Sequence, residues 1–469
     1  MRILLIEPPF SRNQVHVRNS GLAEPLSLGL LAANLPDHDV RILDMRLDPN
    51  LRAELESFKP DLVGAGCYAT GLYVAKRLFR EVKEWNREVV TIAGGHHASL
   101  LPRDFLDPNI DVVVIGEGEI TLRELVRTIE RRGDLAQVQG LAIRKDADLQ
   151  LTPPRPFVDL NESPWPARHL VEKNRHKYFR ASWRPIMSIT TERGCPFRCN
   201  FCSMWKVNEG RYRVRSAESV VEEIASMGSL YPYIDFIDDN TLHDVKRARR
   251  ICELIRERGI QKSYKLYARS DTVVKNPELI ESWSRSGLKV ALIGFESFRD
   301  HDLMSYGKHN SVKNNEEAIR ILHANGVEIA AYFVVNPEWA EDDFKALSEY
   351  VKKWDLTHPI FTILTPLPGT NYYDQVKNKL ITTDHEKFDF FHALLPTHLP
   401  IEVFQQRFYE LWRDAYSFKN VLKRIGQGKF VFSIAQIRGF REFMQDLRSL
   451  ATPASSIKPH SKDMSSLPP

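Results

Sequence analysis

The pattern of apolar and polar positions divides the chain into two series in which short apolar runs alternate with stretches of helical spacing. The first series has five runs rich in Val and Ile: RILLIEP, DVRILD, DLVGAGCY, VVTIAGG and DVVVIGEGE. Between them, PLSLGLLAANL and YVAKRLFREVKEW repeat apolar residues with the period of a helix. This alternation predicts an α/β fold with a doubly wound, Rossmann-like parallel sheet over residues 1–140, whose ligand lies at the carboxyl ends of the strands.

The second series follows a proline-rich stretch, residues 141–185, which predicts an extended linker. Its six apolar runs are IMSITTE, YIDFIDD, YKLYARS, VALIGFE, EIAAYFVV and IFTILTPLP. Helical stretches such as SAESVVEEIASM separate them, and we expect Ser216 to be the N-cap of that helix. Six strand–helix units predict a partial (β/α)6 barrel over residues 186–395. Residues 396–450 predict a helical region, and residues 451–469 a disordered tail.

The strand ends of the first series carry the residues expected at a ligand site. Glycine lets a large planar or phosphorylated ligand approach the backbone closely, although each glycine alone is also explained by a tight turn. Because several such ends occur in one small domain, we favour a ligand. The candidate contacts are Pro9, Cys67, Tyr68, Thr70, Gly94, Gly95, His96, Gly116, Glu117 and Gly118.

Length and composition limit the classes of protein. At 469 residues the chain is too long for one ordinary core. No apolar run is long enough to span a bilayer, and MRILLIEPPF has the pattern of a buried strand rather than of a signal peptide. The net charge of +4 gives no reason to expect a nucleic-acid partner. With only 5 cysteines and no export signal we expect a cytoplasmic protein, where clustered thiols indicate metal binding.

Three of the five cysteines stand close together in TERGCPFRCNFCS, residues 191–203, directly after the first strand of the second series. Thiolates from Cys195, Cys199 and Cys202 can hold three irons of a [4Fe–4S] cluster and leave one iron open to a ligand that is not protein. A structural zinc site wants four closed ligands. A zinc site completed by a distant histidine, or three ordinary buried thiols, are the alternatives.

Together with Phe201 before the last cysteine and the six-strand series, the triplet resembles the radical S-adenosylmethionine (SAM) superfamily. The resemblance implies that the three cysteines hold a [4Fe–4S] cluster and that its open iron binds the amino and carboxylate groups of SAM. It places further SAM contacts at the strand ends and on Phe201 itself. These candidates are Phe201, Asp238, Asp239, Arg269, Glu296 and Thr365. Without the resemblance, each of the polar ones is more simply a surface or core residue.

Two segments of the first domain, TIAGGHHASLLP and VVVIGEGEITL, are similar to the N-terminal domains of cobalamin-dependent radical SAM enzymes. The chain has no D-x-H-x-x-G motif, so the resemblance implies a cobalt whose lower face carries no protein histidine. It also implies a methyltransferase reaction. A 5′-deoxyadenosyl radical takes hydrogen from the substrate, and the substrate radical takes methyl from methylcobalamin. Electrons would come from a flavodoxin or ferredoxin, and no catalytic residue is identified beyond the cofactors.

Within this superfamily, YFRASWRPIMSITTERGCPFRCNFCS, ILTPLPGTNYYD and FDFFHALLPTHLPIEVF are most similar to hopanoid C-3 methylases. This narrower resemblance implies a small, hydrophobic, lipidic substrate. Residues 418–450 agree with it, because they interleave apolar residues with seven Lys or Arg, as a helix lying on the inner membrane face would. A basic helix that covers the open side of the barrel explains the same pattern.

Other reactions share this architecture. A cobalamin-dependent cyclase or rearrangement enzyme would have the same motifs. An RNA methylthiotransferase shares the cysteine triplet, but such enzymes place extra cysteines in the N-terminal domain, where this chain has only Cys67. A cobalamin-binding sensor without catalysis would leave the three clustered cysteines without a role.

Overall fold

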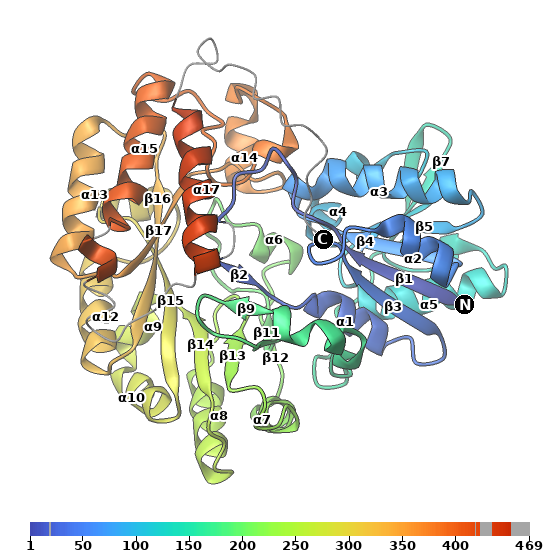
Figure 1. Ribbon diagram of the computed structural model, residues 1–469, viewed down its shortest axis with the longest axis horizontal. Helices are drawn as coiled ribbons and strands as arrows, with labels where there is room; N and C mark the ends of the chain where they lie inside the picture. Colours follow the sequence, from blue (N-terminus) through green and yellow to red (C-terminus); the bar gives the residue numbers. More distant parts are fainter. Residues whose placement is uncertain (18–19, 418, 423–433, 452–469) are drawn as a thin grey trace.

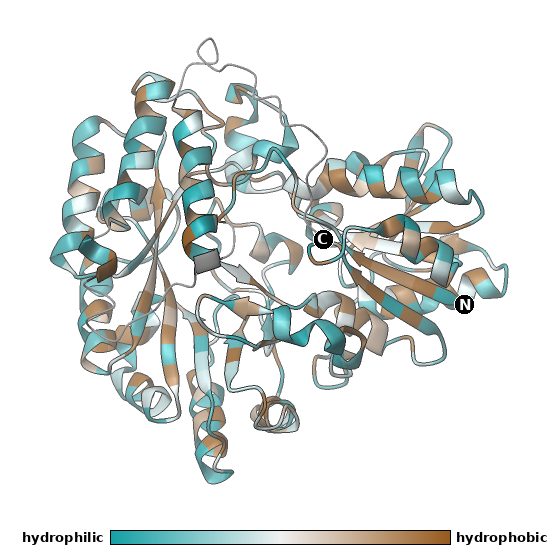
Figure 2. Cartoon of the chain, viewed as in Figure 1, coloured by the Kyte–Doolittle hydropathy of each residue, from teal (hydrophilic) through white to brown (hydrophobic). Residues whose placement is uncertain are grey.

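The computed structural model describes residues 1–17, 20–417, 419–422 and 434–451. Figure 1 shows two α/β bodies beside each other, the first containing the blue N-terminal elements and the second the yellow and orange ones. Each is built on its own sheet, one of seven strands and one of six. The strands of the first body are mostly hydrophobic, the barrel strands mix hydrophobic and hydrophilic positions, and the outer helices show a hydrophilic face (Figure 2).

The first body confirms the doubly wound sheet. Its parallel strands are β1 (Arg2–Glu7), β3 (Asp39–Asp44), β4 (Leu62–Gly66), β5 (Val90–Gly94) and β6 (Val112–Val114), in the order β3-β1-β4-β5-β6. The helices are α1 (Leu26–Ala33), α2 (Leu51–Phe58), α3 (Leu72–Trp85), α4 (His96–Leu100) and α5 (Gly118–Glu130). Separate apolar clusters pack on the two faces of the sheet, so the strands read as continuous apolar runs.

This sheet continues past residue 140, where we placed the start of the linker. Strands β7 (Leu141–Lys145) and β8 (Asp148–Leu151) form an antiparallel hairpin that pairs with β6. The prolines that suggested a linker begin only at Pro153, and β8 is an exposed edge strand with little apolar character. A short polar hairpin of this kind gives no strong sequence signal.

The second body is an open, all-parallel sheet whose six strands follow sequence order. They are β10 (Ile186–Ile189), β13 (Tyr233–Phe236), β14 (Ser263–Ala268), β15 (Leu288–Glu296), β16 (Glu328–Val335) and β17 (His358–Ile363). The covering helices include α7 (Ala217–Ser226), α8 (Val245–Glu257), α10 (Pro277–Arg285), α12 (Val312–Ala324) and α13 (Glu341–Lys353). The Ser216 hydroxyl accepts a hydrogen bond from Ser219 N at 3.1 Å, which confirms the predicted N-cap. These elements form the predicted partial barrel.

Two C-terminal helices close the open side of this barrel. Helix α15 (Ile401–Ala415) packs on α17 (Ile434–Leu450), whose Phe443 and Leu447 are fully buried. These buried residues of α17 agree with the barrel-covering interpretation of residues 418–450, and the membrane contact stays a prediction. Residues 418 and 423–433 of this region, and the predicted tail after residue 451, lie outside the described part of the chain. Among the described helices, none is long and apolar enough to cross a bilayer.

Buried ion pairs join the two bodies. The carboxylate of Glu24 accepts hydrogen bonds from Arg175 at 2.7 Å and from Ser188 N at 2.9 Å, and it also pairs with Arg168. Strand β2 (Gly21–Leu22) pairs with β9 (Phe179–Arg180) beside this contact. Because two guanidinium groups and a backbone amide contact this one carboxylate, the buried charge of Glu24 is paired where the two bodies meet.

Candidate active site

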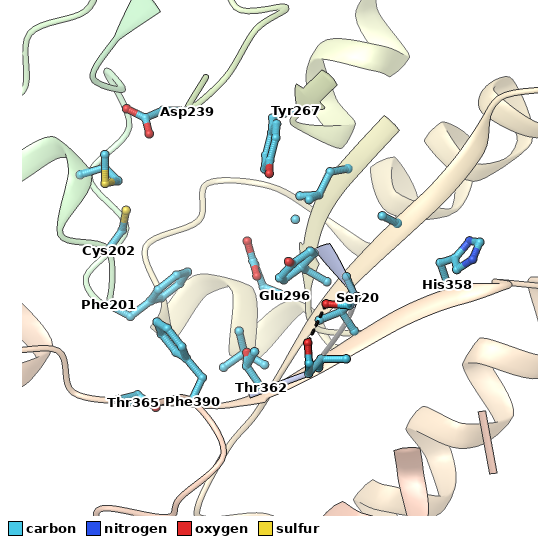
Figure 3. Close-up of a pocket in the computed structure, with 18 of the residues that line it drawn as sticks. Ser20, Phe201, Cys202, Asp239, Tyr267, Glu296, His358, Thr362, Thr365 and Phe390 are labelled. Atoms are coloured by element: carbon cyan, nitrogen blue, oxygen red, sulfur yellow. Dashed lines mark hydrogen bonds between the residues drawn. The ribbon is translucent and has the colours of Figure 1, made fainter. Parts of the chain in front are cut away.

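A cavity of about 1300 Å³ lies between the two bodies, at the carboxyl ends of the barrel strands, and continues into the barrel. Figure 3 shows Cys202, Phe201 and Asp239 on one side of it and His358 on the opposite side. Many predicted site residues line this cavity, and they come from both halves of the chain. These are Tyr68, Thr70, His96, Cys195, Cys199, Phe201, Cys202, Asp239, Arg269, Glu296 and Thr365.

The three cysteines lie on one loop after β10, and backbone contacts fix its shape. Gly194 has φ +86°, and a Cβ there would lie 2.1 Å from the carbonyl oxygen of Arg211, so only glycine fits. The indole Nε1 of Trp205 donates to the carbonyl of Cys199 at 3.0 Å, and Cys202 N donates to the same carbonyl at 3.2 Å. The loop therefore presents its thiols to the cavity from a constrained turn.

The spacing of these thiols fits a cluster better than a single ion. Tetrahedral zinc with Zn–S bonds of about 2.3 Å would hold sulfur atoms roughly 4 Å apart. In the described residues, the three Sγ atoms do not all lie within 4.8 Å of one another. Burial raises the pKa of Cys195 to about 11 and that of Cys202 to about 12, so a thiolate here needs cationic iron beside it. The donor set fits a [4Fe–4S] cluster.

The two adjacent aspartates after β13 have different surroundings. Asp239 lines the cavity, where its carboxylate accepts from Gly194 N at 3.0 Å and burial raises its pKa to about 6. Asp238 is not among the cavity-lining residues. It accepts from the backbone N and the hydroxyl of Thr191, both at 2.6 Å, and so braces the segment before the cysteines. Of the predicted pair, the structure brings only Asp239 to the site.

Arg269 and Glu296 also line the cavity, and each is already held by the protein. The guanidinium of Arg269 donates to Asp271 at 2.9 Å and lies 3.6 Å from the ring centre of Phe197. Glu296, at φ +63°, accepts from Nζ of Lys308 at 2.6 Å. Lys308 lines the same cavity and carried no sequence signal, because it follows a short helix far from the strand motifs.

On the N-terminal side, the predicted ligand residues divide into two groups. Tyr68, Thr70 and His96 line the cavity, and Tyr68 leaves 68% of its surface exposed there. The remaining predicted positions are not among the cavity-lining residues: Pro9, Cys67, Gly94, Gly95, Gly116, Glu117 and Gly118. Cys67 N donates to the carbonyl of Gly94 at 3.3 Å, so these two support the wall rather than form it.

Glu117 is held in an ion-pair network between the two bodies. Its carboxylate accepts from Arg193 and from Arg213, each at 2.7 Å, and from Val158 N at 2.8 Å. Burial acts to raise the pKa of Glu117, but the two guanidinium groups outweigh it and the pKa lies below its ordinary value. This glutamate therefore joins the cysteine loop to the first body, a role that the sequence did not reveal.

The far part of the cavity is mostly apolar, and sequence reasoning did not identify it. Alternate residues of the last three strands face it, among them Val290, Leu292, Ala330, Ile360 and Thr362. Aromatic side chains from the C-terminal segments close it, namely Phe390, Phe391, Trp412, Tyr416 and Phe440. The period-two pattern on these strands was the available signal. Glu328 and His358, whose Oε1 and Nδ1 lie 2.9 Å apart, are at its far end.

Comparison with known proteins identifies the family to which this chain belongs. The family model of the B12 binding domain matches residues 18–126, and that of the radical SAM superfamily matches residues 189–351. The hopanoid C-3 methylase of Methylococcus capsulatus is 31% identical over 452 residues, which cover 91% of this chain and 84% of that protein. The chain belongs to the cobalamin-dependent radical SAM methyltransferase family.

Other similar proteins differ in reaction. The anaerobic magnesium-protoporphyrin IX monomethyl ester cyclase of Rubrivivax gelatinosus is 27% identical, with 83% of this chain and 72% of that protein covered. The radical SAM methyltransferase TsrM of Kitasatospora setae, solved with cobalamin and a [4Fe-4S] cluster, has a TM-score of 0.71 at 17% identity, covering 96% and 99% of the two chains. The radical enzyme OxsB gives 0.72 at 17% identity, covering 96% and 71%. These two structures show the shared fold.

Family membership confirms the predicted cofactors, which are a [4Fe–4S] cluster, SAM and cobalamin. It also sets aside the sensor and the RNA methylthiotransferase as interpretations of this chain.

Proposed function

We propose that this enzyme methylates an unactivated carbon of an elongated, apolar small molecule, and that the substrate is a hopanoid methylated at C-3. The observation that carries the proposal is the continuity of the cavity. One wall holds the three cysteines, and the opposite end is an apolar channel inside the barrel. The name of the 31% identical relative supports the hopanoid assignment.

In this proposal each cofactor has its own part of the wall. Cys195, Cys199 and Cys202 hold the cluster. Phe201, Asp239, Arg269, Glu296 and Thr365 surround SAM, with the Asp239 carboxylate facing its ammonium group. On the other body, Tyr68, Thr70 and His96 contact cobalamin, where the exposed ring of Tyr68 offers a surface to a planar macrocycle.

When bound, the cofactors convert a substrate C–H bond, two SAM molecules and two electrons from a flavodoxin or ferredoxin into a C–CH₃ bond, S-adenosylhomocysteine, 5′-deoxyadenosine and methionine. The protein holds the reacting groups in line and keeps water away from them. The aromatic side chains at the C-terminal wall provide much of that exclusion, because they cover the open edge of the barrel beside β17.

The length of the channel supports a rigid lipid as substrate. Glu328 and Val334 both line the cavity and are six residues apart on β16, which corresponds to about 20 Å. A cavity of about 1300 Å³ is larger than a usual small-molecule pocket, so it has room for a substrate beside the cofactors. Its mostly apolar wall suits a polycyclic hydrocarbon, and the polar pair Glu328 and His358 suits a head group at the far end.

The test is an anaerobic assay of the reconstituted enzyme with SAM, a reduced flavodoxin and a hopanoid, followed by mass spectrometry. We expect 5′-deoxyadenosine, S-adenosylhomocysteine and a hopanoid heavier by one methylene, all absent with Cys195→Ala. A substrate from a lipid extract that loses hydrogen without gaining carbon would instead identify a cyclase. Release of 5′-deoxyadenosine with every lipid unchanged would refute the hopanoid assignment.

A further inference from the structure

Beside the proposed cofactor contacts, one group of side chains in the described residues has the spacing of a metal site, and its member His97 also lines the cavity. Nε2 of His97 lies 2.9 Å from Oδ2 of Asp104, and Nε2 of His385 lies 3.7 Å from the same oxygen. The ligand atoms of all three residues lie within 4.8 Å of one another. Tetrahedral zinc with nitrogen and oxygen ligands at about 2.1 Å needs donors roughly 3.4 Å apart. The three donors are thus close to the required spacing before any ion binds.

The three residues come from different elements and from both bodies. His97 is in α4, Asp104 is in the 3-10 helix Pro102–Phe105, and His385 begins the 3-10 helix His385–Lys387 after the barrel. His97 is 2% exposed. Aromatic side chains pack on the two imidazoles, with Phe105 against His97 and Phe388 against His385. The rings therefore have little freedom to turn away from one another.

One ring nitrogen in the group of His97, Asp104 and His385 lacks a partner. In the described part of the chain, the buried Nδ1 of His385 makes no hydrogen bond. Buried ring nitrogens are normally satisfied, and a ring with one unpaired nitrogen beside a carboxylate is not part of a completed hydrogen-bond network. At 3.7 Å, Nε2 of the same ring is also beyond hydrogen-bond distance of the Asp104 oxygen, and a cation between these two atoms would bind both.

We propose that His97, Asp104 and His385 bind a divalent transition-metal ion of the zinc type, with water at the fourth position, and that this ion fastens the first body to the segment after the barrel. The same segment already clamps the N-terminal strand region. Glu386 accepts from Asn13 at 2.5 Å, and Asp389 accepts from Val15 N at 2.8 Å. The ion would therefore lock α4, which carries cavity-lining His96, to a segment that contacts both bodies. This proposal does not depend on the identity of the methylated substrate.

The experiment counts zinc on the full-length protein after its cluster has been reconstituted, so that the three cysteines are occupied by iron. We expect one zinc per chain to survive desalting after exposure to zinc chloride. His385→Gln and Asp104→Asn should each weaken zinc binding at least about tenfold in equilibrium dialysis. The matched control is His392→Gln. Nδ1 of His392 pairs with Asp389 at 2.9 Å, so this histidine lies on the same segment but is not one of the three proposed ligands.

X-ray absorption at the zinc edge on the unmutated protein decides the case even where a variant fails to fold. Two imidazoles and oxygen, with no sulfur in the first shell, support the site. Sulfur ligands, no retained zinc, or equal retention by all four proteins would overturn it. In thermal unfolding, zinc should raise the midpoint of the unmutated protein and of His392→Gln, and leave that of His385→Gln unchanged.

Discussion

Nε2 of His96 lies 2.8 Å from Oγ of Ser203, and this contact joins helix α4 of the B12 binding domain to the residue that follows Cys202. The two residues are 107 positions apart in the sequence. Burial lowers the pKa of His96 to about 4, so the ring is neutral at physiological pH and the contact is an uncharged hydrogen bond. The contact thus joins the proposed cobalamin wall directly to the residue beside the cysteine triplet.

We predict that Ser203→Ala weakens the connection between the domains while the cluster remains bound. Loss of the hydroxyl leaves a half-buried imidazole nitrogen without this partner, which costs about 1 kcal/mol of unfolding free energy. Urea unfolding gives that value, and hydrogen exchange should speed up in residues 95–101. Ser182→Ala removes another hydroxyl from the same cavity wall and is the control. Equal stability of the two variants would contradict the prediction.

The adjacent aspartates give a second prediction, because only one of them lines the cavity. Asp239→Asn should weaken SAM binding roughly tenfold to a hundredfold, the usual worth of a hydrogen bond to a charged group. Asp238→Asn should instead lower the unfolding free energy by about 1–3 kcal/mol, since it loosens the hydrogen bonds to Thr191. Calorimetric titration with SAM and urea unfolding measure the two effects. Weaker SAM binding by Asp238→Asn alone would reverse the assignment.

A third prediction concerns pH and the ion pairs of Glu117. The folded-state pKa of this carboxyl lies below the ordinary 4.5, so its stabilising contribution is present above pH 4.5 and disappears as the pH falls through the folded value. At pH 7, Glu117→Gln should cost about 3 kcal/mol, because Arg193 and Arg213 lose their partner.

The difference between Glu117→Gln and the unmutated protein should therefore narrow as the pH falls below 4.5. Urea unfolding followed by tryptophan fluorescence from pH 3 to pH 7 measures it. Glu130→Gln removes a half-exposed carboxylate in the same domain and should cost less than about 1 kcal/mol at every pH. A constant gap for Glu117→Gln across this range would show that the ion pairs are not its source.

The apolar channel gives a fourth prediction. Ala330→Phe places a large ring in the channel wall on β16 and should reduce formation of the methylated product at least about tenfold. Iron content and SAM cleavage without substrate should stay within about twofold, because the cysteine loop is at the other end of the cavity. Ala330→Ser, which alters the volume of the side chain only slightly, should retain product formation. Normal methylation by Ala330→Phe would place the substrate elsewhere.

The strand pattern predicted both sheets because their apolar runs are nearly continuous or strictly alternating. It also placed the cysteine triplet on the right loop, since the triplet follows a strand directly. Glu117 was assigned to the ligand site because it follows a strand end, but its partners Arg193 and Arg213 are 76 and 96 residues away. No local pattern reports a contact of that kind.

Asp238 shows a different limit. It lies two positions after Phe236, which is fully buried at the end of β13. The period of a strand would therefore have placed Asp238 on the same side as Phe236 and Asp239 on the opposite side. The signal was present but was outweighed by the acidic character of the pair. Lys308 had no such signal, because it lies in the loop after the short helix Asp300–Ser305 and not on a strand.

The cavity reaches from the cysteine loop to Glu328 and His358 near the starts of their strands. In the proposed arrangement, a lipid bound deep in the barrel does not block the end of the cavity where SAM binds. Each turnover consumes SAM twice, and spent products must be exchanged between the two uses. A long chamber with the two proposed sites at opposite ends would allow that exchange while the lipid stays bound, so a slow-diffusing lipid has to be captured only once per product.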